Sequence, residues 1–358
     1  MAVLDERAVD ERRLEELVHR AVDDVGAALN AALVVLGDRL GLYRALAGAG
    51  RLTAGEVAER TGTSEPYVRE WLNAQVAGGY VDYEPDSGRY VLPPEAAVAL
   101  TDESSPAHLA GLFQLALGAV LDSPRVAQAA RAGGGIEPGA RCPDICEGRE
   151  RFARASYAAH LVPRWLHALD GAVAKLRGGG LVADVGCGRG AGTILMAAAF
   201  PAASFRGFDR NGESIVTARK RARAAGVEGN VEFRTAAAES YSGDGYDLVT
   251  MLDCLHDLGD PAGAARRVRR SLAPDGAWMI VEPYAGDRVE QNLTPVGRAY
   301  YGFSTLLSTP SSLSEGVGLA LGAQAGEARI REIVTGAGFS SFRRVAETPF
   351  TMVFEARP

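Results

Sequence analysis

Apolar residues recur every three or four positions along the first 50 residues. At this spacing, side chains share one face of an α-helix. The stripe consists of Leu14, Leu17, Val18, Val22, Leu33, Leu36, Leu40 and Leu42. Gly48 and Gly50 then interrupt the pattern. We therefore predict that the N-terminal helical region ends just before these glycines.

Two short helical patterns and two short strand-like patterns follow. Thr53 with Glu56 three residues later has the form of a capping box, which predicts the start of one helix. Ser64 is expected to cap a second helix after a tight turn. Runs at 80–83 and 89–92 then have strand character and flank a turn. Helix, turn, helix and hairpin in this order predict a winged helix.

From residue 181 onward, the pattern changes to strands that alternate with helices. Strand patterns fall at 181–185, 204–208, 231–234, 246–251 and 276–282, with helical patterns at 191–200, 212–225 and 260–272. The chain finishes with a helical pattern at 327–337 and strand patterns at 341–346 and 349–356. Such alternation is typical of a parallel sheet with crossover helices. Only two residues separate the last two strands, so they are expected to pair antiparallel.

These patterns predict an α/β protein with a mainly helical winged-helix domain at its N-terminus. We place the helical and winged-helix domain at 1–130, a helical linker at 131–176 and the sheet domain at 177–358. The segment 285–325 interrupts the alternation after the fifth strand. As an insertion beside a sheet edge, it is expected to form a lid or a pocket wall.

Composition and charge exclude several classes of protein. The 358 residues are 47% hydrophobic and 23% charged, which is ordinary for a globular chain and long enough for two domains. A net charge of -7 disfavours a nucleic-acid partner. No run approaches the roughly 18 apolar residues of a membrane span, and the charged N-terminus does not resemble a signal peptide. Four cysteines predict no disulfide framework, so we expect a cytoplasmic protein.

DNA binding by the winged helix is the first alternative to weigh. Its second helix would be the recognition helix. The segment from Asp38 to Glu95 contains nine acidic residues and six arginines, whereas contact with phosphates needs the opposite sign. Trp71, Leu72 and Val76 on that helix have the character of buried residues. We therefore favour a supporting role for this domain over DNA recognition.

The strongest chemical signal is the glycine-rich loop LVADVGCGRGAG at 181–192. A buried strand carries Asp184 and runs into Gly186 and Gly188, and a helix follows. Glycines let the backbone turn tightly and approach a ligand, and the helix N-terminus offers free N–H groups. With Ala191 in the third place, the loop also fits the dinucleotide fingerprint. An acidic residue two positions before the first glycine favours S-adenosylmethionine (AdoMet), because it can meet the ammonium group of this cofactor.

A second acidic residue supports a nucleoside cofactor. Asp209 follows the next predicted strand, 23 residues after Gly186. A carboxylate there can accept hydrogen bonds from both ribose hydroxyls. NAD-binding proteins use an acidic residue in the same way, so Asp209 predicts a nucleoside without identifying it. A nicotinamide-dependent oxidoreductase therefore remains an alternative.

With these motifs, the chain from about 181 to 356 resembles the class I AdoMet-dependent methyltransferases. The loop matches the first motif of that family, and Asp209 matches its ribose-binding acid. The resemblance implies a seven-stranded sheet with a reversed last strand and AdoMet as the cofactor. The segment 233–240 falls where the family contacts adenine, although many members have an Asp where this chain has Ala237. The expected cofactor-binding residues are Asp184, Gly186, Gly188, Asp209, Arg210, Ala237, Ala238 and Asp253.

The loop after the fourth strand carries the catalytic candidate, His256. Ligands sit at the carboxyl ends of strands in open parallel sheets, so His256 is expected to face an acceptor. A neutral imidazole suits a general base near pH 7. The segment LHDL resembles the LHDW-type motif of winged-helix small-molecule O-methyltransferases, and Leu258 replaces its aromatic residue. This resemblance implies that His256 removes the proton of the accepting hydroxyl, while Asp257 is expected to orient the loop or cap the next helix.

The predicted lid is rich in apolar and aromatic residues. They are Val296, Tyr300, Tyr301, Phe303, Leu306 and Leu307. Further candidates from the middle helices are Phe113, Leu117, Phe152, Tyr157 and Trp165. Such a wall suits a hydrophobic small molecule. No metal site is expected, because Cys142 and Cys146 lack a second Cys/His pair nearby.

The sequence thus predicts a cytoplasmic AdoMet-dependent methyltransferase that acts on a small metabolite, at a hydroxyl. The resemblance implies that the winged-helix domain supports a homodimer and contributes to the substrate pocket. No nucleic acid and no membrane are expected as partners. Two alternatives remain beside the oxidoreductase: methyl transfer to nitrogen, carbon or sulfur, and a winged-helix regulator that senses AdoMet.

Overall fold

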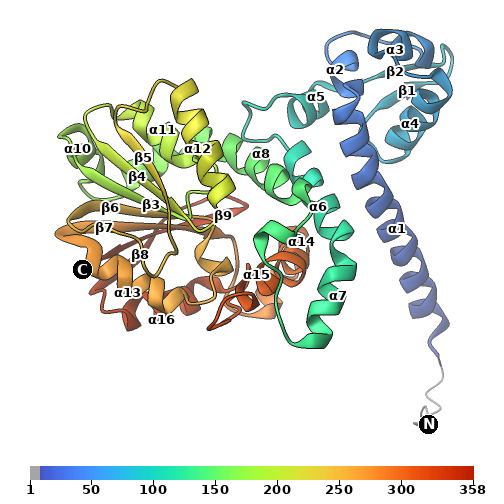
Figure 1. Ribbon diagram of the computed structural model, residues 1–358. Helices are drawn as coiled ribbons and strands as arrows, with labels where there is room; N and C mark the ends of the chain where they lie inside the picture. Colours follow the sequence, from blue (N-terminus) through green and yellow to red (C-terminus); the bar gives the residue numbers. More distant parts are fainter. Residues whose placement is uncertain (1–8) are drawn as a thin grey trace. The chain divides into compact units, whose positions relative to one another are not determined.

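The computed structural model describes residues 9–358, and the chain divides into two compact units (Figure 1). The first unit is Met1–Leu117 and the second is Gly118–Pro358. The boundary lies within helix α6 (Ala110–Leu121). The segment predicted as a separate linker, 131–176, therefore lies inside the second unit.

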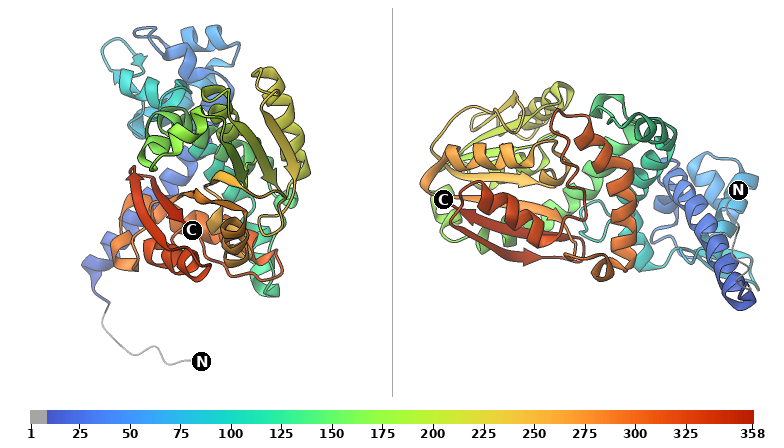
Figure 2. Two further views of the ribbon diagram at one scale, coloured as in Figure 1. Left: turned by 90° about the vertical axis from the view of Figure 1, so that its left-hand side faces the viewer. Right: turned by 90° about the horizontal axis from the view of Figure 1, so that it is seen from below.

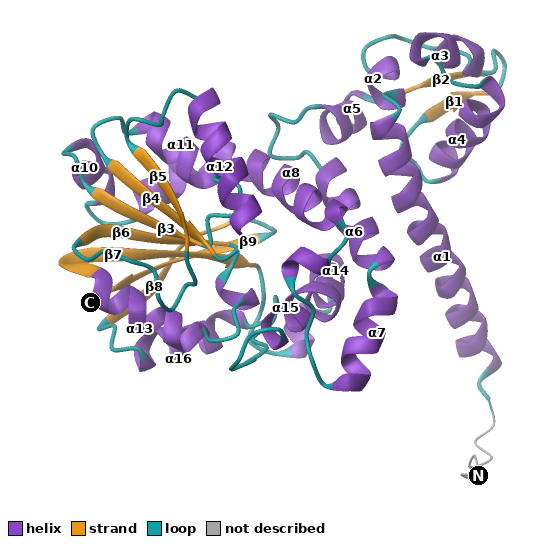
Figure 3. Cartoon of the chain, viewed as in Figure 1, coloured by secondary structure: helices purple, strands orange, loops and turns teal. Residues whose placement is uncertain are grey.

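The first unit is helical apart from one short hairpin, as Figure 3 shows. Its helices before α6 are α1 (Glu11–Arg39), α2 (Leu42–Leu46), α3 (Ala54–Thr61), α4 (Glu65–Ala77) and α5 (Pro94–Thr101). Strand β1 (Asp82–Glu84) pairs antiparallel with β2 (Arg89–Val91). The winged-helix order predicted from the sequence is confirmed.

The N-caps predicted for α3 and α4 differ in the structure. The predicted capping box of α3 is present: the Thr53 hydroxyl accepts from the Glu56 N–H at 3.2 Å, and the Glu56 carboxylate accepts from the Thr53 N–H at 2.7 Å. Ser64 is the N-cap of α4, but its hydroxyl makes no capping hydrogen bond, contrary to expectation. Pro66 in the first turn of α4 removes one N–H group that would need a partner.

The N-terminal apolar stripe divides into an exposed and a buried part. Leu14, Leu17, Val18 and Val22 on α1 expose between 49% and 64% of their surface. The helix ends at Arg39 rather than near residue 48, because Gly41 takes the left-handed conformation with φ 72° and starts a separate helix. The core of this unit is built instead on residues including Leu42, Leu46, Val57, Trp71 and Leu72.

The second unit contains a seven-stranded sheet in the order β5-β4-β3-β6-β7-β9-β8. Its strands are β3 (Leu181–Val185), β4 (Ser204–Asp209), β5 (Val231–Thr235), β6 (Tyr246–Leu252), β7 (Leu272–Pro283), β8 (Ser341–Glu347) and β9 (Thr351–Arg357). The neighbouring pairs among β3 to β7 are parallel, and β9 runs antiparallel to both β7 and β8. This confirms the predicted α/β fold with a reversed last strand.

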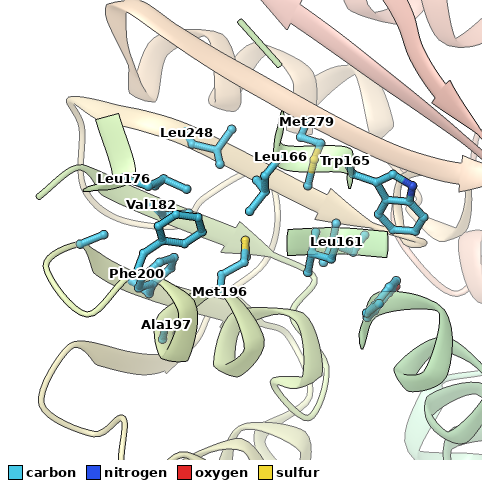
Figure 4. Close-up of a cluster of buried hydrophobic side chains, with 14 of the residues drawn as sticks. Leu161, Trp165, Leu166, Leu176, Val182, Met196, Ala197, Phe200, Leu248 and Met279 are labelled. Atoms are coloured by element: carbon cyan, nitrogen blue, oxygen red, sulfur yellow. The ribbon is translucent and has the colours of Figure 1, made fainter. Parts of the chain in front are cut away.

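Helices cover both faces of this sheet, as Figures 1 and 2 show. They are α10 (Ala172–Arg177), α11 (Ala191–Ala199) and α12 (Gly212–Ala224) on one face, and α13 (Pro261–Ser271) and α16 (Gly326–Gly336) on the other. Buried residues of the strands alternate between two hydrophobic clusters. Val182 packs with Met196 in one cluster, which Figure 4 shows, while the next residue, Ala183, belongs to the other. The strands are thus buried on both faces, as parallel strands usually are.

Two helical segments complete the second unit beside the carboxyl ends of the strands. The first contains α7 (Ser123–Ala132), η1 (Pro138–Ala140), α8 (Pro143–His160), a π-helical turn (Leu161–Trp165) and α9 (Leu166–Ala168). The second, in the predicted lid, contains η4 (Val289–Asn292), α14 (Pro295–Phe303), a π-helical turn (Ser304–Ser308) and α15 (Thr309–Leu313).

Hydrogen bonds join these two segments. The Ile136 N–H donates to the Pro310 carbonyl at 2.8 Å. The Arg141 guanidinium donates to the carbonyls of Leu306 and Leu307 at 3.1 and 2.9 Å. A Cβ on Gly135 would lie 2.0 Å from the backbone nitrogen of Ser314, so this approach requires glycine. The lid is therefore fastened to the loop that precedes α8.

Candidate active site

A cavity of about 630 Å³ lies in the second unit, at the carboxyl ends of β3 to β6. Its wall contains all eight residues predicted to bind the cofactor: Asp184, Gly186, Gly188, Asp209, Arg210, Ala237, Ala238 and Asp253. These residues follow or end four strands that are adjacent in the sheet. Their convergence is therefore a consequence of the strand order, because parallel strands end at one edge.

The glycine-rich loop forms a tight turn at the base of this cavity. Gly186 has φ 76°, and the N–H groups of Gly186 and Cys187 donate to the Phe208 carbonyl at 2.8 and 3.0 Å. A Cβ on Gly186 would lie 2.5 Å from the Cys254 sulfur. Both the conformation and the space therefore require glycine at this position.

Asp184 is a buried carboxylate that ties three elements together. One oxygen accepts from the Thr193 hydroxyl of α11 at 2.5 Å, and the other accepts from the Thr250 hydroxyl of β6 at 2.8 Å. Burial raises the pKa of Asp184 to about 6, against the opposing effect of these two hydrogen bonds. The carboxylate still lines the cavity, where a cationic group would favour its charged form.

Asp209 is held by backbone groups on both sides. One oxygen accepts from the Gly188 N–H at 2.9 Å and the other from the Asn211 N–H at 2.8 Å. Burial raises its pKa. Each carboxylate oxygen has a second lone pair, so the group can accept two further hydrogen bonds from a ligand in the cavity.

Arg210, next to Asp209, is paired to two acidic residues from other segments. Its guanidinium contacts the carboxylate of Glu137, in the loop before α8, and that of Glu315, after α15. Glu315 also accepts from the Gly259 N–H at 2.5 Å. All three ion-paired residues line the cavity. The side chain predicted to touch the cofactor thus also fastens the lid to the sheet edge.

His256 lies at the expected edge of the sheet, but beneath the cavity wall rather than in it. The imidazole is buried, and its Nδ1 lies 2.8 Å from a carboxylate oxygen of Glu282 at the end of β7. Its Nε2 lies 3.2 Å from an oxygen of Asp257. Burial alone would lower the pKa of His256, but the carboxylates of Asp257 and Glu282 outweigh burial and raise it to about 10. Both ring nitrogens thus lie near carboxylates, and the role of His256 as general base stays a prediction.

Asp257 is the member of this cluster that reaches the cavity. Its other carboxylate oxygen accepts from the Arg149 guanidinium of α8 at 2.6 Å. Burial raises the pKa of Asp257, but Arg149 and His256 outweigh burial and hold the pKa below its usual range. Asp257 and Arg149 therefore form a charged pair in the cavity wall. His256 itself does not belong to that wall.

Asp253 has an unusual backbone conformation. It is one of two described non-glycine residues with positive φ, at 57°, and its N–H donates to the Val281 carbonyl at 2.8 Å. Its side chain lines the cavity, and burial raises its pKa. Within residues 9–358, this bond of its N–H is the only hydrogen bond of Asp253.

Sequence reasoning missed the charged residues that come from outside the sheet motifs. Arg141, Arg149, Glu137 and Glu315 line the cavity, but no motif or period marks them in the sequence. Of the expected aromatic and apolar lining residues, only Tyr157 and Leu307 belong to the cavity wall. Other lid residues have structural contacts; the Tyr300 hydroxyl, for example, donates to the Phe350 carbonyl at 2.9 Å. Within the described part of the chain, no group of three or more His, Cys, Asp or Glu is placed to hold a metal.

Comparison with known proteins agrees with this architecture. Residues 27–102 match the model of the Rv2258c-like winged HTH domain, and residues 177–316 match that of a methyltransferase domain. The chain is 34% identical over 106 residues to the uncharacterized methyltransferase YcgJ of Bacillus subtilis. That match spans 29% of this chain and 41% of the relative, less than half its length.

Solved structures show the same fold over nearly the whole chain. A candidate O-methyltransferase from Nostoc punctiforme superimposes with a TM-score of 0.72 at 19% identity, over 95% of this chain and 98% of that one. Human N-acetylserotonin methyltransferase superimposes with a TM-score of 0.68 at 18% identity, over 100% and 99%.

The two domain matches decide which domains the chain carries. It has an N-terminal winged HTH domain and a methyltransferase domain. The family resemblance noted in the sequence is thereby confirmed. In this methyltransferase, the glycine-rich loop, Asp209 and the acidic cluster after β6 meet at one cavity. The roles of the individual residues remain predictions.

Proposed function

We propose that this methyltransferase transfers a methyl group from AdoMet to a small, hydrophobic molecule, at a hydroxyl group. The observation that carries the proposal is one cavity shared by two sets of residues. The predicted cofactor residues line one part of it, and α8 and the lid contribute other residues, including Ile145, Ala153 and Leu307. A nucleoside cofactor and an acceptor could therefore meet inside the second unit.

The charges of the cavity wall suit a cationic cofactor. Eight acidic residues and four arginines line it. Arg149, Arg189 and Arg210 are paired with acidic residues of the same wall. The acidic residues left without an arginine partner are Asp184, Asp209, Glu239 and Asp253. A sulfonium and an ammonium group would compensate this excess of negative charge.

The residues present supply the contacts that AdoMet would need. Asp184 and the glycine-rich loop would hold its amino acid end, Asp209 its ribose, and the segment around Ala237 and Ala238 its adenine. When bound, AdoMet supplies a methyl group already activated on sulfur. The chain then has to align an acceptor with this methyl group and exclude water. The human neighbour named above was solved in complex with AdoMet, which supports this cofactor.

The acceptor proton would leave toward the cluster at the end of β6. The sequence hypothesis gives the role of base to His256. In the free protein that imidazole is held between Glu282 and Asp257. The hypothesis has a direct test, since His256→Ala should slow transfer to a hydroxyl by at least tenfold if the imidazole is the base.

Binding and transfer experiments test the proposed function. Calorimetry should show binding of AdoMet and S-adenosylhomocysteine (AdoHcy) and none of NAD or NADP. Incubation with methyl-labelled AdoMet and a lysate of the source should then label a small-molecule fraction. Label in macromolecules would contradict the proposal. Binding of AdoMet without transfer, combined with a salt-dependent shift of DNA, would favour the regulator instead.

We propose further that the protein is a cytoplasmic homodimer that binds neither nucleic acid nor membrane. The exposed apolar face of α1 supports association with a second copy, because a stripe of this kind on a monomer would remain in water. The acidic balance of the winged helix argues against DNA. Over residues 9–358, the structure contains no helix with the length and apolar character to cross a bilayer.

A further inference from the structure

The four arginines of the cavity wall differ in what compensates their positive charge. Arg149 is paired with Asp257, and both Arg189 and Arg210 are paired with acidic residues of the same wall. Arg141 differs from them, because it makes no ion pair within residues 9–358. Its charge is therefore left without an acidic partner in the described part of the chain.

The contacts of Arg141 orient its side chain without neutralising it. The guanidinium donates to the Leu306 carbonyl at 3.1 Å and to the Leu307 carbonyl at 2.9 Å. Carbonyl oxygens fix the plane of a guanidinium, but they carry no full negative charge. These bonds use two of its five N–H groups, and the other three have no partner among residues 9–358. Three N–H groups thus remain for a ligand.

The acidic residues around Arg141 are already bonded to other arginines. Asp257 and Asp122 are the carboxylates that act most strongly on its charge. Asp257 accepts from the Arg149 guanidinium at 2.6 Å, and Asp122 accepts from the Arg125 guanidinium at 2.6 Å. Among these residues, two carboxylates face three guanidinium groups. The excess of one positive charge lies on Arg141, because the other two arginines are paired.

An unpaired charge in a partly buried site is unfavourable. Burial lowers the pKa of Arg141, because the protein excludes part of the water that would stabilise the cation. A charge taken out of water is normally paired with a group of opposite sign. Ile145 and Leu307 of the same wall are apolar and offer no such group. The molecule that occupies the cavity can supply the missing counter-ion.

We propose that Arg141 binds an anionic group of the acceptor, so that the substrate is a hydrophobic hydroxy acid and the guanidinium determines its orientation. This inference rests on the proposed function and adds the charge of the substrate to it. A carboxylate suits the site, since its two oxygens can accept two N–H bonds from one guanidinium. The apolar wall at Ile145 and Leu307 contacts the rest of the molecule. The methyl group goes to the hydroxyl, and the carboxylate leaves the reaction unchanged.

The carboxylate of AdoMet itself is the rival partner for Arg141. Asp184 and Asp209, which are assigned to the cofactor, belong to β3 and β4. Arg141 is instead bonded to the lid, and its charge interacts with Asp257, which follows β6. This difference in position favours the acceptor. The two partners can be distinguished with AdoHcy, which has the carboxylate of the cofactor and contains no acceptor.

Binding of two matched probes to the AdoHcy complex is the first measurement. The probes are 2-naphthoate and 2-naphthamide, which have nearly the same size and differ in charge. Calorimetry should show that the wild type binds the carboxylate at least about tenfold more tightly than the amide. Arg141→Gln should lose this preference, while Arg141→Lys should keep part of it. Equal affinities in the wild type, including undetectable binding of both probes, would overturn the proposal, as would an unchanged preference in Arg141→Gln.

Gly135→Ala separates the charge of Arg141 from its contact with the lid. Arg141 also fastens the lid through the carbonyls of Leu306 and Leu307. A Cβ at position 135 would lie 2.0 Å from the Ser314 nitrogen, so this variant loosens the lid without changing any charge. It should weaken both probes alike and keep their affinity ratio close to that of the wild type. If Gly135→Ala lost the preference as Arg141→Gln does, the lid contact would explain it and the proposal would fail.

The affinity for AdoHcy alone decides between acceptor and cofactor. Arg141→Gln should bind AdoHcy about as tightly as Gly135→Ala, because both variants loosen the lid and the proposal gives Arg141 no contact with the cofactor. An affinity for AdoHcy at least about tenfold lower in Arg141→Gln than in Gly135→Ala would assign the guanidinium to the cofactor carboxylate and overturn the proposal.

The charge of the natural product is the second measurement. The small molecule labelled in the lysate should bind an anion exchanger at pH 7, where a carboxylate is charged. A labelled compound that is neutral or cationic at this pH would overturn the proposal, and so would a methyl ester formed at the carboxylate. A wild type that binds AdoHcy but labels nothing would contradict the proposed function instead, while the affinity ratio of the two probes still tests the anion site.

Discussion

The acidic residues of the cavity have different hydrogen-bond partners, and we expect their functions to differ accordingly. Asp184 is bonded by two threonine hydroxyls, Asp209 by two backbone N–H groups and Asp257 by a guanidinium. Hydroxyl and N–H partners leave the carboxylate free to receive a cation or further donors from a ligand. A guanidinium partner removes that freedom. At the scale of the residue, we therefore expect Asp184 and Asp209 to bind a ligand and Asp257 to have a structural role.

Asp209→Asn should weaken the binding of AdoHcy by about tenfold or more. Both groups that Asp209 accepts from are N–H donors, so an amide would turn its own NH2 toward one of them. A hydrogen bond to a charged group contributes about 1.5–3 kcal/mol, and the ribose contact would be lost as well. Calorimetry with AdoHcy measures the change, with Glu213→Gln, in the exposed first turn of α12, as the matched control. Equal affinities for the two variants would refute the ribose role.

The ion pair of His256 makes the free energy of unfolding depend on pH in a defined direction. The pKa of His256 is about 10 in the folded protein, compared with about 6.5 in an unfolded chain. The pair therefore contributes fully below about pH 6.5, and its contribution is lost as the pH rises toward 10. The difference in unfolding free energy between the wild type and His256→Gln should thus be largest at pH 6 and shrink by pH 10. Urea titrations at several pH values measure it, and a difference that grows with pH would contradict the pairing.

At the scale of the element, the sequence predicted the bounds of a strand well where a short apolar run is buried on both faces. Strand β3 has the bounds that its apolar run predicted, 181–185. Strand β7 instead begins at Leu272, four residues before the predicted start, because Leu272 pairs with Tyr246 ahead of a register shift. The sequence instead predicted Leu272 as the last residue of a helix, at 260–272. Pairing with a neighbouring strand, which no local pattern records, therefore determined this boundary.

The candidate site could be predicted only in part, because no local pattern records contacts between residues that are distant in the sequence. Residues that follow strands, such as Asp209, are placed by the sheet and were found from the sequence. The ion pairs Arg149–Asp257 and Arg210–Glu315 join residues more than 100 positions apart. Their partners lie on helices and loops without a period or motif that would place them. Tertiary packing alone brings them together.

Gly186 and Gly188 of the glycine-rich loop differ in the space around their Cα atoms, and this difference gives a prediction. Both have positive φ, but a Cβ on Gly188 would meet nothing within 4 Å, whereas one on Gly186 would lie 2.5 Å from the Cys254 sulfur. Gly188→Ala should cost about 1–2 kcal/mol of stability from backbone strain alone. Gly186→Ala should cost more, because the end of β6 must also move. Urea unfolding of both variants measures the difference, and equal losses would show that the contact with Cys254 relaxes freely.

At the scale of the whole molecule, α1 has an apolar face that lies exposed in a single chain. The helix has 29 residues and spans about 43 Å. Val18, Val22, Val25 and Leu29 follow one another at intervals of four, three and four residues, and each exposes more than half of its surface. This spacing is that of helices that pair along a continuous seam. A second copy of the chain presents the same seam, which suits the symmetric contact of a homodimer.

A charge placed on this seam should therefore convert the proposed dimer to a monomer. Val22→Glu would bury a carboxylate against a second apolar helix, and the cost of an unpaired buried charge exceeds what such a contact can compensate. Light scattering after gel filtration should give twice the chain mass for the wild type and a single chain mass for the variant. Ala27→Glu adds the same charge on the opposite face of α1, where a dimer is expected to persist. If both variants or neither became monomeric, α1 would not be the dimer seam, because only contact along this face distinguishes position 22 from position 27.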